Sequence, residues 1–295
     1  MGNYNQKTFR VDGTEPFSIK KAPTRIKDVY DDKKEYEEML AGSIRDLDEM
    51  QNMMYAHNRY GLLVIFQALD AAGKDGTIRH VLSGVNPAGI RVETFKRPTS
   101  LELEHDYLWR TTRMLPERGT ITIFNRSYYE EVLVVKVHPE ILTGTQLLPD
   151  ELKADVGNVM ENRYKDIRNF EKYLYRNGIR VVKFFLNISK KEQAERLIER
   201  IKDPGKNWKF EEGDVKERNY WDDYQKAFED CINATATKKC PWYVIPADDK
   251  KNMRLIVGKI IGEEMKKLDM HYPETSPERA AELQQFIEII EGQNK

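Results

Sequence analysis

The chain has 295 residues, 33% of them charged and 40% hydrophobic, a composition typical of a soluble globular protein with one large α/β domain or two small ones. Its net charge of −1 and the lack of a basic arm argue against general nucleic-acid binding, and no apolar run reaches the ~18 residues of a membrane span. Cys231 and Cys240 form neither a metal-binding spacing nor a disulfide framework, and residues 1–30 lack an apolar signal core, so we expect a cytoplasmic protein.

The amino-terminal part predicts an arm and then a long helix. Residues 1–32 are polar and without a clear period, which favours an arm lying on the surface. Residues 33–60 carry apolar side chains at steps of three or four, as an amphipathic helix does. The two methionines in this stripe, Met50 and Met54, are expected to pack in the core.

Short apolar runs with β-branched residues then alternate with helical segments. The runs are typical of strands buried on both faces and lie at 61–70, 89–95, 119–125, 178–189 and 241–249. The helical segments lie at about 74–83, 101–115, 127–135, 150–176, 190–201, 214–233 and 250–267. This alternation predicts a three-layer α/β/α domain over 33–272 with a mainly parallel five-stranded sheet, followed by a helical tail over 273–295. Ligands of such sheets bind at the carboxyl ends of the strands.

A candidate phosphate-binding loop follows the first strand. Residues 66–77 read FQALDAAGKDGT, and a helix is predicted to begin within them. Gly73 and Gly76 allow close backbone approach, the first amides of the helix point at a ligand, and Lys74 supplies a positive charge for a β- or γ-phosphate. The alternative is an ordinary turn between strand and helix; the strand context and the two glycines around a lysine favour the phosphate loop.

This loop departs from the G-x-x-x-x-G-K-[ST] pattern at two positions. Ala68 stands where the first Gly is usual, and Asp75 stands where Ser or Thr is usual. A carboxylate beside a phosphate repels it unless a cation offsets the negative charge, and Mg²⁺ is a cation that prefers oxygen ligands. Asp70 is therefore a candidate metal ligand. It could also orient or deprotonate an attacking phosphate oxygen. For Asp75, a metal-related role and a helix first-turn acid remain equally open.

A second candidate site follows the strand at 119–125. Asn125 stands where phosphate-loop enzymes usually carry an Asp that reaches the metal, and Arg126 is expected to grip phosphates with its planar guanidinium. Ser127 and Glu130 have the spacing of a helix capping box, so we expect a structural role for Glu130.

Residues 190–220 predict a lid. The segment carries many charges of both signs, breaks at Asp203-Pro204-Gly205, and contains Trp208 and Phe210. Arg196 and Arg200 lie one turn apart on one helix face, with Lys206, Lys209 and Arg218 following. One interpretation is a solvated face of ion pairs, as the spacing of Glu192 and Arg196 allows. We favour a flap that closes over an anionic ligand.

Three blocks together resemble the polyphosphate kinase 2 family. They are LDAAGKDGTIRHVLSGVNPAGIRVETFKRPT, YLWRTTRMLPERGTITIFNRSYYEEVLVVKVHP and KFFLNISKKEQAERLIERIKDPGKNWKF, in matching order and spacing between about residues 30 and 272. The resemblance implies a phosphate-loop kinase fold with a helical lid. It also implies transfer of phosphoryl groups between inorganic polyphosphate and adenine or guanine nucleotides with Mg²⁺ or Mn²⁺. Asn125 and the YYEEVLVVKVHP continuation resemble the class III members, which are associated with both AMP and ADP as acceptors. Family members tend to form dimers or tetramers, so a homo-oligomer is expected.

The resemblance also implies roles for individual residues. Asp70, Lys74, Asn125 and Arg126 are the expected catalytic residues, with Asp70 as the metal ligand. The expected phosphate- or nucleotide-binding residues are Ala71, Ala72, Gly73, Asp75, Gly76, Thr77, Arg79, Arg113 and Lys136. Arg196, Arg200, Lys206, Lys209 and Arg218 are expected to bind polyphosphate from the lid.

Two other functions share part of this pattern. An ATP-dependent nucleoside monophosphate kinase would have the same loop, lid and sheet, but polyphosphate would be inert as its donor. A non-catalytic nucleotide-binding switch would have no turnover, so Asp70 would be dispensable for it. The agreement of three separate blocks favours the polyphosphate kinase.

Overall fold

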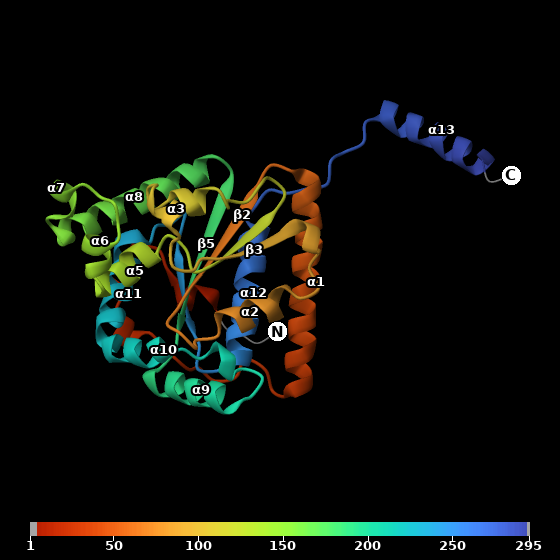
Figure 1. The fold of residues 1–295 in the computed structure, drawn as a ribbon. Coiled ribbons are helices and arrows are strands. Elements are labelled where there is room, and N and C mark those ends of the chain that lie inside the picture. Colours follow the sequence, from red (N-terminus) through yellow and green to blue (C-terminus); the bar gives the residue numbers. More distant parts are fainter. Residues whose placement is uncertain (1–4, 294–295) are drawn as a thin grey trace.

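The fold is built on one six-stranded sheet (Figure 1). A computed structural model describes residues 5–293. The strand order is β1-β6-β5-β2-β4-β3, and every neighbouring pair is parallel except β1 with β6. The predicted α/β class with a mainly parallel sheet is confirmed, but the predicted number of five strands is wrong.

The elements follow one another in the expected alternation. The strands are β1 (Arg10–Val11), β2 (Gly61–Gln67), β3 (Ile90–Thr94), β4 (Ile121–Asn125), β5 (Ile179–Asn187) and β6 (Trp242–Pro246). The helices are α1 (Lys33–His57), α2 (Lys74–Leu82), α3 (Ser100–Leu103), α4 (Trp109–Thr112), α5 (Glu130–Val137), α6 (Glu140–Gly144), α7 (Asp150–Lys153), α8 (Val156–Arg176), α9 (Lys190–Lys202), α10 (Glu212–Glu217), α11 (Trp221–Thr235), α12 (Lys250–Lys266) and α13 (Pro277–Gln293).

The extra strand comes from the amino-terminal segment. Arg10 and Val11 pair antiparallel with Tyr243 and Trp242 of β6, so the segment forms an edge of the sheet rather than only lying on the surface. Nearby, Phe9 is buried in the apolar core. A two-residue strand is too short for a periodic pattern, which is why the sequence did not reveal it.

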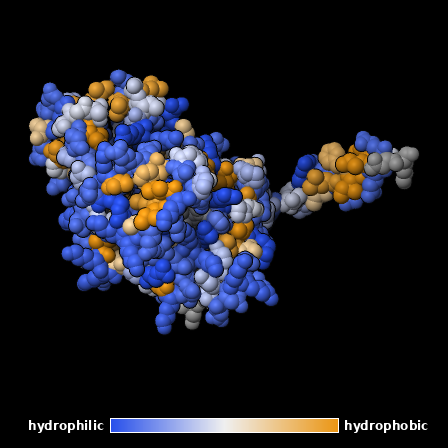
Figure 2. Space-filling model, turned by 60° about the horizontal axis from the view of Figure 1, so that its bottom comes forward, coloured by the Kyte–Doolittle hydropathy of each residue, from blue (hydrophilic) through white to orange (hydrophobic). Residues whose placement is uncertain are grey.

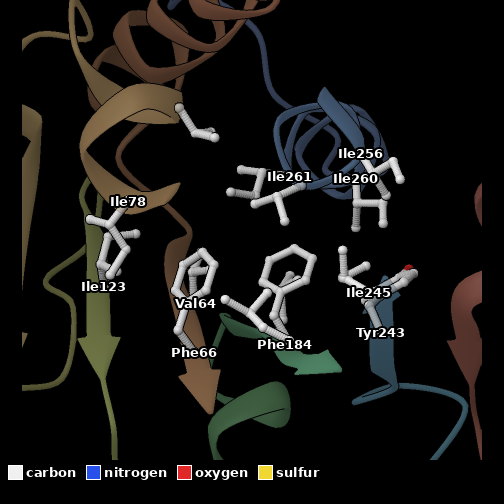
Figure 3. Packing of buried hydrophobic residues seen from close by; sticks show 14 of the residues in the cluster. Val64, Phe66, Ile78, Ile123, Phe184, Tyr243, Ile245, Ile256, Ile260 and Ile261 are labelled. Carbon is white, nitrogen blue, oxygen red and sulfur yellow. The ribbon is translucent and has the colours of Figure 1, made fainter. Parts of the chain in front are cut away.

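Two apolar cores hold the three layers together. Residues of β2 point alternately to the two faces: Leu62 and Val64 join the core under α1, α2 and α12, whereas Leu63 and Ile65 join the core under α5, α8 and α11. Figure 3 shows the first core, where Phe66 and Phe184 stack with ring centroids 5.1 Å apart. Met54 is fully buried there, as predicted.

Several helices differ from the predicted segments. The segment predicted as one helix over 101–115 contains the short helices α3 and α4, and the segment over 150–176 divides before Asp155, whose side chain caps α8. The segment over 214–233 divides into α10, a 3₁₀ turn at Arg218–Tyr220, and α11. Capping groups and short turns set these boundaries without changing the apolar period, so periodicity alone could not find them.

The last helix stands away from the rest of the chain. α13 projects from the body after an extended segment, and none of its described side chains is buried (Figures 1 and 2). The predicted tail is therefore helical, but it does not pack on the sheet domain. Nowhere in residues 5–293 does a helix combine the length and apolar character that crossing a bilayer requires. The boundaries predicted at residues 32 and 272 stay predictions.

A buried ion pair lies in the core between β5 and α8. The Lys183 Nζ is 2.6 Å from the Glu171 Oε2, and both side chains are almost completely buried. Tyr128 and Tyr129 donate hydrogen bonds to Glu171 at 3.0 and 2.7 Å. Burial and the nearby Glu171 charge raise the pKa of both tyrosines, which therefore remain hydroxyl donors. The pair fixes the start of α5 against the sheet.

We expect Lys183→Met to reduce the free energy of unfolding by about 3–5 kcal/mol, because it leaves the Glu171 carboxylate buried without its cation. Denaturant unfolding measures this, with Lys172→Met as the control, since Lys172 is exposed beside Glu171. Equal losses in the two variants would contradict the assigned importance of the pair.

Candidate active site

The loop between β2 and α2 has the backbone shape of an anion-binding turn. Ala71 and Gly73 both have positive φ, +63° and +104°, and α2 begins at the next residue, Lys74. A Cβ on Gly73 would lie 3.3 Å from the Met253 Cε, and the left-handed φ there disfavours any other residue. The first amides of α2 therefore face the carboxyl end of β2, where a phosphate is stabilised by the helix dipole.

Lys74 lies within this loop rather than in solvent. Its side chain is buried, and its Nζ donates to the Ala68 carbonyl at 2.9 Å. Burial, followed by the Arg126 charge, lowers the pKa of Lys74, while three nearby carboxylates oppose that shift. A phosphate beside Lys74 would add negative charge and stabilise the ammonium form.

Arg126 connects the two carboxylates of the site. Its Nη2 donates to the Asp70 Oδ1 at 2.7 Å, and its Nη1 donates to the Glu130 Oε2 at 3.3 Å. The charge of Glu130, with a smaller contribution from Asp70, raises the pKa of Arg126. Arg126 has a φ of +64°, and its N–H donates to the Phe66 carbonyl, so the turn after β4 stays tied to β2. This left-handed turn directs the guanidinium toward the loop.

The predicted capping box at Ser127 and Glu130 is wrong. α5 begins at Glu130 with Tyr129 as its cap residue and no side-chain cap, and Ser127 accepts from the Tyr129 N–H instead. The Glu130 carboxylate contacts Arg126 and accepts from the Gln67 Nε2 at 3.0 Å. Glu130 is therefore the first residue of α5, but its side chain contacts the site and does not cap the helix.

Asn125 and Asp75 form a direct contact across the two strand ends. The Asn125 Nδ2 donates to the Asp75 Oδ1 at 2.8 Å, and Asp75 lies in the first turn of α2. A carboxylate is thus present at this point even though Asn replaces the usual Asp at the end of β4. Thr77 is buried, and its hydroxyl donates to the Gly73 carbonyl at 2.9 Å.

Arg196 supports the loop through hydrogen bonds to its backbone carbonyls. Its guanidinium is buried and donates to the Ala72 and Ala247 carbonyls at 2.8 and 2.7 Å, with further bonds to the carbonyls of Ala71 and Asp248. The Glu192 carboxylate accepts from its Nε at 2.9 Å. In this arrangement Arg196 fixes the loop to the end of β6, and the polyphosphate contact expected for it stays a prediction.

A cleft opens between the loop and the lid, residues 190–220. It encloses about 540 Å³, part of it open to solvent. Its lining residues are Ala68, Leu69, Asp70, Arg126, Glu130, Leu133, Val134, Gln193, Asp214, Glu217, Arg218, Trp221, Tyr224 and Phe228. The cleft therefore joins the end of β2, the start of α5, and the lid with the first turns of α11.

The chain is similar to known proteins over most of its length. The family model of polyphosphate kinase 2 (PPK2) matches residues 30–273. The chain belongs to the polyphosphate kinase 2 family. An ADP-polyphosphate phosphotransferase of Rhodopseudomonas palustris is 52% identical over 95% of this chain and 96% of its own length. An AMP/ADP-polyphosphate phosphotransferase of Meiothermus ruber is 46% identical over 83% of this chain and 86% of its own length. The crystal structure of polyphosphate kinase 2 from Arthrobacter aurescens superposes with a TM-score of 0.87 at 34% identity, covering 98% of both chains.

The site brings together only some of the residues expected to act in this family member. Asp70, Arg126 and Arg218 line the cleft, and Lys74, Asp75 and Asn125 adjoin it through the contacts above. The other expected contacts lie elsewhere: Arg79 is exposed on α2, Arg113 stacks on Trp109, Lys136 pairs with Asp230, Lys206 pairs with Asp203, and Lys209 stacks on Trp208. Direct roles for these five remain predictions.

Gln193 and Tyr224 are site residues that no sequence motif marks. Both line the cleft; Gln193 donates to the Asp70 carbonyl at 3.0 Å and accepts from Arg218 at 2.6 Å. The Tyr224 hydroxyl donates to Glu217 at 2.7 Å. Their only sequence signal is a place within the predicted lid, for Gln193, or directly after it, for Tyr224, and many neighbouring residues share that place.

The carboxylate oxygens in the cleft suit a hard cation that also binds the phosphates of a substrate. Among residues 5–293, no group of three or more His, Cys, Asp or Glu side chains could hold a metal by itself. Mg²⁺ commonly uses one or two carboxylates, together with water and substrate phosphates. Asp70, which is partly exposed at the cleft, fits that requirement.

We expect Arg196→Met to lower the free energy of unfolding by about 2–3 kcal/mol, because the carbonyls of Ala72 and Ala247 lose a buried donor. The amides of residues 72–75 should also exchange hydrogen faster than in the unchanged protein, as followed by mass spectrometry. Lys191→Met is the control, since Lys191 is an exposed residue of the same helix. Unchanged exchange in the loop would rule out the supporting role.

Proposed function

We propose that the protein transfers the terminal phosphoryl group of inorganic polyphosphate to ADP and AMP, reversibly and with Mg²⁺. The observation that carries the proposal is the convergence of Asp70, Lys74 and Arg126 at the start of α2, beside a cleft covered by a charged lid. The R. palustris and M. ruber relatives, both named as polyphosphate phosphotransferases, support it.

The residues of the site match the needs of phosphoryl transfer. The terminal group of polyphosphate is already activated, so catalysis consists of in-line positioning and charge stabilisation. Lys74 and the amides of α2 hold the phosphate at the loop, and Arg126 faces the same region with two donors. Asp70 orients the attacking phosphate oxygen and ligates Mg²⁺. The metal ion, when bound, neutralises phosphate charge.

We further propose that AMP and ADP both serve as acceptors, as in the class III members that the sequence resembles. The M. ruber relative, which is named as an AMP/ADP enzyme and is 46% identical over 83% of this chain, supports this. The R. palustris relative is named for ADP alone, so the acceptor range needs its own test.

With Mg²⁺, polyphosphate and ADP, we expect ATP to form, and Asp70→Asn to lower kcat by about 100-fold or more, since the acceptor oxygen loses its carboxylate partner. Coupled detection of ATP measures the rate. Asp269→Asn, an exposed acid after α12, is the matched control and should leave the rate unchanged. If polyphosphate phosphorylates neither ADP nor AMP while ATP converts AMP to ADP, the activity is that of an ATP-dependent nucleoside monophosphate kinase instead.

With AMP in place of ADP, the same assay should give ADP first and then ATP. Separation of the nucleotides by chromatography during the reaction would show this order. If only ADP is phosphorylated, the proposed acceptor range is wrong although the polyphosphate reaction stands.

We also propose that the protein is a homo-oligomer, a dimer or a tetramer. The support is α13, which exposes Leu283, Phe286, Ile287 and Ile290 on one side. Figure 2 shows apolar side chains gathered on this projecting helix. An isolated helix of this length with such side chains in water is only marginally stable, so a partner surface is needed.

Light scattering of the full chain should therefore give two or four times the mass of 34.6 kDa. Replacing both Ile287 and Ile290 by Gln should shift the mass toward the monomer, because the apolar face is then interrupted. A monomeric mass for the unchanged chain over the micromolar range would contradict the proposal.

A further inference from the structure

The lid pairs its cations with its own acids. Arg200 donates to the Asp214 Oδ2 at 3.0 Å, Lys206 pairs with Asp203, and Lys216 pairs with Glu212 at 3.2 Å. To bind one of these Lys or Arg side chains, a polyanion has to displace the carboxylate that is already bonded to that side chain. The lid is thus nearly neutral by itself, although it contains the cations expected to bind polyphosphate.

Asp214 differs from the other acids in this set because it faces the cleft. It lines the cleft together with Asp70 and Arg126, and its side chain is only 14% exposed, whereas the Glu212 side chain is 84% exposed. Asp214 also forms the capping box at the start of α10 with Glu211. Its carboxylate is therefore held in place at the point where the lid meets the loop.

The surroundings of Asp214 disfavour a second anion. Burial, followed by the Asp70 charge, raises the pKa of Asp214. Of the six charged residues that line the cleft, Asp70, Glu130, Asp214 and Glu217 are acidic, and Arg126 and Arg218 are basic. Among the side chains that line the cleft, a polyphosphate chain therefore meets more acids than bases, and Asp214 contributes one of these acids directly beside Arg200.

We propose that Asp214 limits the affinity of the lid for polyphosphate by holding Arg200 and by repelling the phosphates that would replace it. This inference rests on the proposed function and concerns the regulation of that same site. Arg200 binds the polyphosphate chain only when its bond to Asp214 is exchanged for a bond to phosphate. Asp214 thereby favours release of the shortened polymer after each transfer.

In the opposite role, Asp214 orients Arg200 toward the phosphates, and its removal weakens polyphosphate binding. The two roles predict changes of opposite sign. Asp214→Asn separates them, because the amide keeps an oxygen acceptor for Arg200 and for the Glu211 N–H while the negative charge is lost.

We expect Asp214→Asn to lower the dissociation constant of polyphosphate about 3- to 10-fold at low salt, the effect of one nearby screened charge. Isothermal titration calorimetry of the full chain with polyphosphate, without nucleotide, measures this directly. The difference between the two proteins should shrink at 0.5 M salt, because screening weakens a Coulomb effect. The KM for polyphosphate should fall in parallel, while the KM for ADP stays the same.

Glu212→Gln is the matched control, since it removes the same charge from the same helix at an exposed position paired with Lys216. It should leave the dissociation constant unchanged, and thermal unfolding of both variants checks that each is folded. An equal or larger dissociation constant for folded Asp214→Asn would overturn the inference while leaving the proposed function intact. If the unchanged protein neither binds nor uses polyphosphate, the proposed function itself fails.

Discussion

The site depends on the register between two neighbouring parallel strands. Phe66 of β2 lies opposite Asn125 of β4, so both strands end at the same level and their following turns meet. The bond from the Arg126 N–H to the Phe66 carbonyl extends this pairing by one residue. A shift of one residue would exchange the faces of β4 and turn Asn125 away from Asp75, so the buried pattern of the strand also positions the chemistry.

Charge compensation in the site follows from this placement. The loop collects groups that attract phosphate, and the same turns place Asp70, Asp75 and Glu130 among them. Each of these carboxylates has a donor at the end of the neighbouring strand: Arg126 for Asp70, Asn125 for Asp75 and Gln67 for Glu130. The site is therefore held by internal bonds before a substrate binds, and binding consists of exchanging those bonds rather than filling an unpaired cationic cleft.

The sequence predicted what local patterns encode. Apolar runs marked the five parallel strands, and the glycine and lysine spacing at residues 66–77 marked the loop. The run at 89–95 was expected to be buried on both faces, but β3 is an edge strand in which no residue is buried, so that part of the prediction is wrong. It did not predict β1, because two residues carry no period, and it misread Glu130, because its spacing from Ser127 matches a capping box that the backbone does not form. Arg196 illustrates a further limit: a helix-face pattern shows which residues share a side, but not how deeply that side is buried.

Hydrogen bonds between the start of α9 and the sheet restrict how the lid can move. The Asp248 carboxylate accepts from the Ser189 N–H at 2.7 Å, and Arg196 bonds to carbonyls of the loop and of β6, so the first two turns of α9 are fixed to the sheet. A hinge there would break several buried hydrogen bonds at once. At residues 203–206 the contacts are local: Asp203 accepts from the Gly205 N–H and from Lys206. The rest of the lid is held by longer-range bonds, which join Arg218 to Gln193 and Glu217 to His138. A hinge is therefore least costly at residues 203–205, where the helix already ends before Pro204, and movement of the following segment would separate Asp214 from Arg200 and Arg218 from Gln193.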